Sequence, residues 1–199
     1  MDWLFGLLEG RNMDSRIVEK IRKLVEEECK KDTNTFGDQI WTYHILSVVR
    51  YGKFLARKLH ADEEIVEIAA LLHDIAGIKD RDNYENHHLL GAEEAEKILK
   101  RFKYPQEKIE KVKHCIYSHR GSKAISRETL EAKCVASADA MAHFDRIPAL
   151  LYFVFVRLGM DIDEGTKWLR DKLNRSWSKL IPEAKEIVRD KYEATKIIF

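Results

Sequence analysis

The chain has 199 residues, enough to bury a substantial core, and its 35 Lys and Arg residues nearly balance its 34 Asp and Glu residues. A formal net charge of +1 creates no long-range field for polyanions, which disfavours nucleic acid as the main partner. Nine glycines and three prolines are few beside 35% charged residues, and this composition favours helices over turn-rich sheets.

Apolar residues recur every three or four positions along most of the chain, which is the period of amphipathic helices. The predicted fold class is therefore all-α, a bundle of about eight to nine helices. Without a linker, an internal repeat or a low-complexity segment, residues 1–199 are predicted to form one domain. The predicted helices span residues 14–31, 40–59, 63–76, 88–102, 105–119, 127–144, 149–158, 163–180 and 182–198.

Several helix ends are marked by residue type. Asp62 and Ser126 are predicted N-caps, and Gly77 is predicted to end the helix that Asp62 starts. Residues 78–87 are predicted to form a charged connection. The 149–158 helix is hydrophobic nearly all round, so we expect it to be buried or to face a second subunit.

Neither a membrane span nor a disulfide framework is expected. The N-terminus has no positively charged n-region, and no stretch approaches about 18 apolar residues. The three cysteines are widely spaced without a CxxC pair, which indicates core residues in a reducing compartment and a cytoplasmic protein. An apolar N-terminal segment is compatible with a clasp on the core or with a homodimer; it comprises Trp3, Leu4, Phe5, Leu7 and Leu8.

Four polar residues interrupt strongly apolar helical stretches. His44 lies on the apolar face of its helix, His73 and Asp74 follow EIAALL, and Asp139 lies within ASADAMA. An ionised carboxylate among alanines is costly to bury unless it is paired or bound to a metal. Imidazole and carboxylate groups together suit divalent ions such as Zn, Mn, Fe and Co, and facing helices can bring such ligands around one ion.

The ordered segments HILSVVRYGKFLA, AALLHDIAG and VASADAMA resemble the HD superfamily of metal-dependent phosphohydrolases over roughly residues 40–145. The resemblance implies an HD-type helical domain with helical extensions at both ends. It also implies that His44, His73, Asp74 and Asp139 bind a divalent ion, with Mn, Zn, Co, Fe and Ni as candidates.

Two further histidines extend the resemblance toward a second metal. His87 lies four residues before Gly91 in HHLLGAEEA, and His119 ends a helix in HCIYSHR, as histidines do in HD members that hold two ions. His88 is the alternative to His87, and His114 is the alternative to His119. Their participation would make a one-metal site a two-metal site.

The chain also departs from the family pattern. Gly77 stands where the HDxGK form of the motif has a lysine, and the nearest lysine is Lys79. There is no GYP segment, which disfavours the cyclic-di-nucleotide phosphodiesterases of that subtype. The resemblance therefore does not carry a particular substrate.

The function that the resemblance implies is phosphohydrolysis of a small phosphorylated metabolite or nucleotide by a metal-activated water. Asp74 would bind the ion and orient or deprotonate the water, while Arg120 or Lys79 would offset developing charge. One alternative is an HD-fold di-iron oxygenase, which would need both His87 and His119 as ligands. Another is a non-catalytic regulatory or binding module that a metal stabilises.

Overall fold

The computed structural model describes residues 2–123 and 125–199, with side chains from Arg16 onward. All regular elements in these residues are helical, which confirms the all-α prediction. Eight α-helices have ten residues or more: α1 (Asp2–Cys29), α2 (Leu46–Leu59), α3 (Glu63–Leu72), α5 (His87–Arg101), α6 (Gln106–Ser118), α7 (Leu130–Asp145), α9 (Ile162–Lys179) and α10 (Pro182–Ile198). The shorter elements are α4 (Ile75–Lys79), α8 (Ile147–Leu151), the 3₁₀-helix η2 (Arg81–Asn86) and the π-helices η1 (Trp41–Ile45) and η3 (Tyr152–Arg157).

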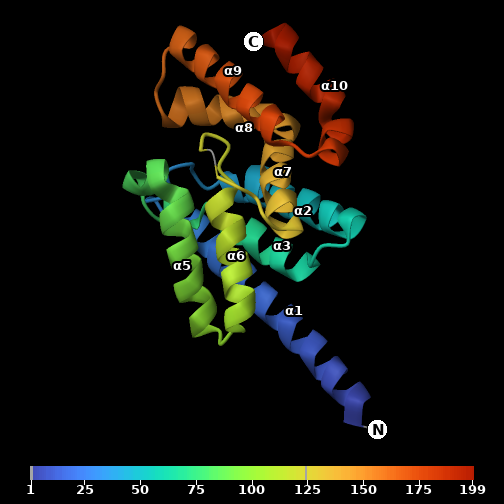
Figure 1. Ribbon diagram of the computed structural model, residues 1–199. Coiled ribbons are helices and arrows are strands. Elements are labelled where there is room, and N and C mark those ends of the chain that lie inside the picture. The colour runs from blue at the N-terminus through green and yellow to red at the C-terminus, as the bar shows by residue number, and fades with distance from the viewer. Residues whose placement is uncertain (1, 124) are drawn as a thin grey trace.

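The centre of the bundle is α7, which packs against α2, α3, α6, α9 and α10. Figure 1 shows α9 and α10 together at one end of the molecule, the α5–α6 pair on one side and α1 extending toward the N-terminus. Small side chains let neighbouring helices approach α7 closely, and Ala136, Ala138, Ala140 and Ala142 are all fully buried. Asp139 is thereby fixed at the middle of the fold.

The helical path is interrupted at His73 and Asp74. α3 ends at Leu72 and α4 begins at Ile75, with Asp74 between them at φ −105° and ψ 8°. The predicted end at Gly77 is wrong, because Gly77 is buried inside α4. The position is tight for another reason: a Cβ there would lie 3.1 Å from a ring carbon of Phe36, so that ring would have to shift.

Side-chain caps start two helices that lead toward the site. Asp62 caps α3 as predicted, accepting hydrogen bonds from two backbone amides of the first turn at 3.1 and 3.2 Å. The α7 cap is Thr129, whose hydroxyl accepts from a backbone amide at 3.1 Å. The prediction of Ser126 as this cap is wrong, because α7 starts later than its apolar pattern suggests.

Two other segments differ from their predictions. The connection predicted for residues 78–87 contains the end of α4 and the whole of η2. The helix predicted over residues 149–158 is formed by α8 and the π-helix η3. It is buried on one side only, because Val154 is fully buried while Val156 is 63% exposed.

The three cysteines are part of the core. Cys29, Cys115 and Cys134 are free and buried, as expected for core residues. Within the described residues, none of the helices combines the length and apolar character that crossing a bilayer requires. The clasp predicted for Trp3 to Leu8 concerns side chains outside the described ones.

We expect replacement of Asp62 by alanine to lower the free energy of unfolding by about 1 kcal/mol, because α3 loses the acceptor for its first amides. Urea denaturation followed by circular dichroism would measure the change. Asp62→Asn keeps an acceptor oxygen and should remain close to the wild type. Equal stability of Asp62→Ala and the wild type would contradict this role.

Candidate metal centre

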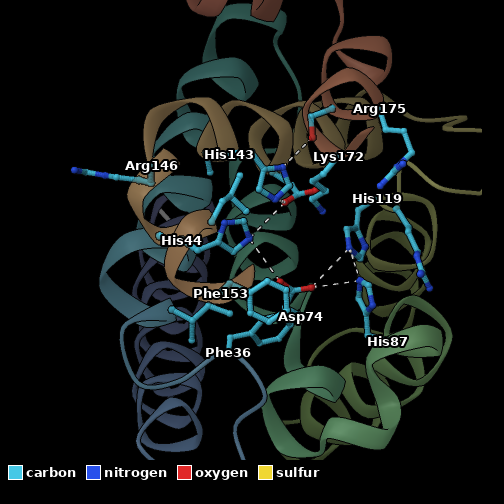
Figure 2. Close-up of a pocket in the computed structure, with 18 of the residues that line it drawn as sticks. Phe36, His44, Asp74, His87, His119, His143, Arg146, Phe153, Lys172 and Arg175 are labelled. Atoms are coloured by element: carbon cyan, nitrogen blue, oxygen red, sulfur yellow. Dashed lines mark hydrogen bonds and ion pairs between the residues drawn. The ribbon is translucent and has the colours of Figure 1, made fainter. Parts of the chain in front are cut away.

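The first group of candidate ligands meets where η1, the α3–α4 break and α7 converge. His44 Nε2 lies 3.1 Å from His73 Nε2, 3.4 Å from Asp139 Oδ1 and 3.5 Å from Asp74 Oδ2. His44 belongs to the π-helix η1, a wider turn that often occurs at functional sites. Three helical segments thus bring two imidazoles and two carboxylates close together. Figure 2 shows His44 and Asp74 of this group facing each other.

A second group lies on the other side of Asp74. The Oδ1 atom of Asp74 is 3.4 Å from His87 Nε2 and 3.9 Å from His119 Nε2, and these two nitrogens are 3.2 Å apart. Figure 2 shows Asp74 between His44 on one side and His87 with His119 on the other. One carboxylate therefore presents an oxygen to each group.

The alternatives left by the sequence separate clearly in space. His88 stacks near Tyr117, with ring centroids 6.0 Å apart, and its Nδ1 has no hydrogen-bond partner among the described residues. His114 instead accepts a hydrogen bond from the Glu128 backbone amide at 3.2 Å. His87, and not His88, therefore faces Asp74, and His119, and not His114, faces it as well.

Backbone hydrogen bonds fix the orientation of three of these rings. The Nδ1 atoms of His73, His87 and His119 lie 2.8, 2.6 and 2.6 Å from the carbonyl oxygen three residues earlier in the chain. A carbonyl can only accept, so Nδ1 carries a proton in each ring. When such a ring is neutral, its Nε2 is unprotonated and available to a metal. This is the orientation that metal-binding histidines usually adopt.

The charge state of the second group agrees with this arrangement. Burial lowers the pKa of His87, and burial followed by the charges of His87 and His73 holds the pKa of His119 well below its ordinary value. Both rings are therefore neutral near pH 7. Two unprotonated nitrogens facing each other at 3.2 Å repel unless a cation lies between them, so the donor set fits a metal ion.

Both central carboxylates are ionised despite their burial. Burial would raise the pKa of Asp74, but the charge of His73 and hydrogen bonds from His44 and His73 hold it well below its usual range. Burial likewise opposes ionisation of Asp139, and the charges of Lys179 and His143 outweigh it. Ionised carboxylates and neutral imidazoles are the forms in which these side chains bind metals.

α9 contributes residues that the sequence analysis did not identify as part of the site. Lys179 forms an ion pair with Asp139 Oδ2 and donates to the His119 carbonyl oxygen at 3.1 Å. Ser176 Oγ lies 3.0 Å from Nδ1 of His143, whose Nε2 is 3.3 Å from Asp139 Oδ1. Ser176, a polar residue on the apolar face of residues 163–180, is the signal that could have indicated this helix, whereas nothing in the sequence distinguishes Lys179 from a solvent-facing lysine.

The two groups open into a cavity of about 260 Å³. Its wall is mainly cationic along α9 and after α6 and α7, and mainly aromatic around η1, η2 and η3, with Trp168 added from α9. The cations are Arg120, Arg146, Lys172, Arg175 and Lys179, and the aromatic residues are Phe36, Tyr43, Tyr84, Tyr152, Phe153 and Trp168. The cavity thus offers one region for an anion and another for an apolar or planar group.

The two basic residues predicted to act in catalysis are placed differently. Arg120 lines the cavity, although its guanidinium also forms an ion pair with Glu85 at 2.9 Å. Lys79 is not among the residues that line the cavity, and its ammonium pairs with Glu94. Only Arg120 of the two is therefore in position to meet a ligand there.

The arrangement of helices recurs in solved structures. Bacillus subtilis YpgQ superposes with a TM-score of 0.67 over 90% of each chain, at 22% sequence identity. A structure of YpgQ in complex with ADP superposes with a TM-score of 0.63 over 88% of this chain and 90% of that chain, at 23% identity. A predicted HD superfamily hydrolase from an uncultured Thermotogales bacterium has a TM-score of 0.55 over 78% of this chain and 84% of that chain at 22% identity. At these identities the likeness concerns the fold.

Sequence comparison matches part of the chain to known proteins. An uncharacterized protein of Clostridium beijerinckii is 32% identical over 83 residues, 41% of this chain and 53% of that protein, so the chain spans about half the length of the curated relative it matches. The HD domain model matches residues 41–143, which include both groups of candidate ligands. The chain therefore belongs to the HD domain family.

Proposed function

We propose that the chain is a metal-dependent phosphohydrolase whose substrate is a nucleotide or another small phosphorylated metabolite. The observation that carries the proposal is the joining of a carboxylate–imidazole cluster and a cationic wall in one cavity. The cluster suits divalent metal ions, and the cations suit the phosphate that such ions bind.

The proposed ligands divide between two ions. His44, His73 and Asp139 would hold the first with Oδ2 of Asp74, and His87 would hold the second with His119 and Oδ1 of Asp74. A bound divalent ion supplies a lowered water pKa and polarises a phosphoryl oxygen. Asp74 would set the separation of the two ions by presenting one oxygen to each.

The remaining wall residues have roles that follow from their charge and shape. Arg120 would offset the negative charge that develops on the phosphoryl oxygens. Tyr43, Tyr152 and Trp168 would contact the nonphosphate part of the substrate, and a planar base suits such a surface. The binding of ADP by YpgQ supports a nucleotide as that substrate.

A di-iron oxygenase is the second candidate, because His87 and His119 both face Asp74, as such a centre would require. Metal analysis separates the two functions. Two irons per chain with oxygen consumption would favour the oxygenase, whereas exchangeable Mn²⁺, Zn²⁺ or Co²⁺ with phosphate release would favour the phosphohydrolase. The cationic wall is the reason for preferring the phosphohydrolase.

We expect the wild-type chain to bind two Mn²⁺ ions, and His87→Ala and His119→Ala to bind one. Each substitution removes a ligand from the second group and leaves the first intact. Elemental analysis after gel filtration, together with calorimetric titration, would measure the stoichiometry.

His114→Ala is the matched control for this experiment, because His114 lies in α6, five residues before His119, and contacts Glu128 instead of Asp74. It should retain two ions. A wild-type chain that binds one ion, with the same affinity after His87→Ala, would contradict the two-metal centre.

We expect Mn²⁺-loaded protein to release phosphate from at least one compound in a panel of nucleotides, cyclic nucleotides and sugar phosphates. Asp74→Ala should reduce kcat/KM about a thousandfold, because metal assistance contributes several kcal/mol to such reactions. His114→Ala should match the wild type.

The proposal would be wrong if folded Asp74→Ala, saturated with Mn²⁺, hydrolysed the substrate as fast as the wild type. No turnover across the panel, combined with a large fall in melting temperature on chelation, would instead favour a metal-stabilised regulatory module.

A further inference from the structure

One face of α9 is directed at the metal cluster. Trp168, Lys172, Arg175, Ser176 and Lys179 all line the cavity, and they recur at intervals of three and four along the helix. That spacing places them in one stripe. α9 therefore contributes a continuous wall to the cavity, and it lies beyond residues 41–143, which match the HD domain model.

The two lysines of this stripe have different partners. The Lys179 ammonium is held by the Asp139 carboxylate and the His119 carbonyl oxygen. Lys172 makes neither a hydrogen bond nor a salt bridge with the residues that the structure describes, although its side chain reaches the same cavity (Figure 2). Lys172 is thus a lysine in the wall of the site that forms no ion pair with the described residues.

Lys172 is half-buried in the cavity wall, so its ammonium is only partly solvated, and a bound anion would stabilise its charge. The two central carboxylates already have partners in the histidine rings, and Asp139 has Lys179 as well. Arg175 and Arg120 line the same cavity and add positive charge. The free hydrogen-bonding capacity of Lys172 therefore suits an anion that enters with the ligand.

We infer that Lys172 binds a nonbridging oxygen of the phosphoryl group beside the metal cluster, and that α9 thereby forms the phosphate-binding wall of the site. The identity of the anion rests on the proposed function. An ammonium is a compact donor that suits a phosphoryl oxygen as a point charge, whereas Lys79, which the sequence suggested for this role, is paired with Glu94.

The test is calorimetric titration of the Mn²⁺-loaded chain with inorganic phosphate. Lys172→Met removes the charge while keeping an unbranched side chain, and we expect it to weaken phosphate binding about ten- to hundredfold. Lys172→Arg keeps the charge and should remain within a few-fold of the wild type. Lys167→Met is the matched control, because Lys167 is an exposed lysine of α9 that pairs with Asp171.

Thermal unfolding supplies a second readout that does not require turnover. Phosphate should raise the melting temperature of the wild type and Lys167→Met, and it should raise that of Lys172→Met much less. Without phosphate, Lys172→Met should melt no lower than the wild type, because it removes a cation that forms no ion pair with the described residues. Unchanged metal content would verify that the cluster is intact in the variant.

Equal phosphate affinity of Lys172→Met and the wild type would overturn the inference. Phosphate binding that depends on Lys172, without hydrolysis of any compound in the panel, would support the inference and contradict the proposed function. If instead Lys172→Met changed neither phosphate binding nor hydrolysis by the chain, the result would support the proposed function and contradict the role of Lys172.

Discussion

The constraint on which the rest of the structure depends is the burial of two ionised carboxylates, Asp74 and Asp139, at the centre of a helical bundle. Water reaches them only from the cavity, so neighbouring groups must provide most of the stabilisation of their charge. Imidazoles approach Asp74 from both sides, and Lys179 reaches Asp139 from α9. The imidazoles and the ammonium that contact Asp74 and Asp139 come from segments far apart in the sequence. The stabilisation of the two carboxylates and the packing of the helices around α7 therefore depend on each other.

Helix ends provide the geometry of this cluster. The last carbonyl groups of a helix have no partner within the helix. His73 directly follows α3 and His119 directly follows α6, and each ring donates Nδ1–H to one of those free carbonyl groups. The same hydrogen bond satisfies the helix terminus and turns Nε2 toward Asp74. The break in the helix between α3 and α4 therefore orients the His73 ring. A continuous helix through His73 would leave no free carbonyl group at Ala70 to accept the hydrogen bond.

The all-helical fold could be predicted from the sequence because it depends on local apolar patterns. Some site residues also stand out locally, whereas the full set of candidate ligands came from the resemblance to the HD superfamily. A carboxylate within ASADAMA and a histidine after EIAALL are anomalies that a single helix reveals. The sequence did not predict helix ends such as that near Gly77. A glycine often ends a helix, but Gly77 lies inside α4 and packs against Phe36. Nor did the sequence identify Lys172 or Lys179, because charged residues on a predicted helix face look the same whether they meet solvent or a distant carboxylate. It also suggested Lys79, whose partner Glu94 is 15 residues away in sequence and becomes a neighbour only through the α4–α5 packing.

The division of the site between two parts of the chain bears on what can be inferred from relatives. Residues 41–143 match the HD domain and contain both candidate metal groups, whereas α9 lies outside that match. A relative that shares only the matched core would share the candidate ligands without necessarily sharing the α9 wall. If the ions supply the reaction and α9 binds the phosphoryl group, then selectivity for the ligand depends on the part of the chain where family membership is least informative. Similarity at about 20% identity therefore shows the fold, whereas ligand selectivity depends on the individual side chains that line the cavity.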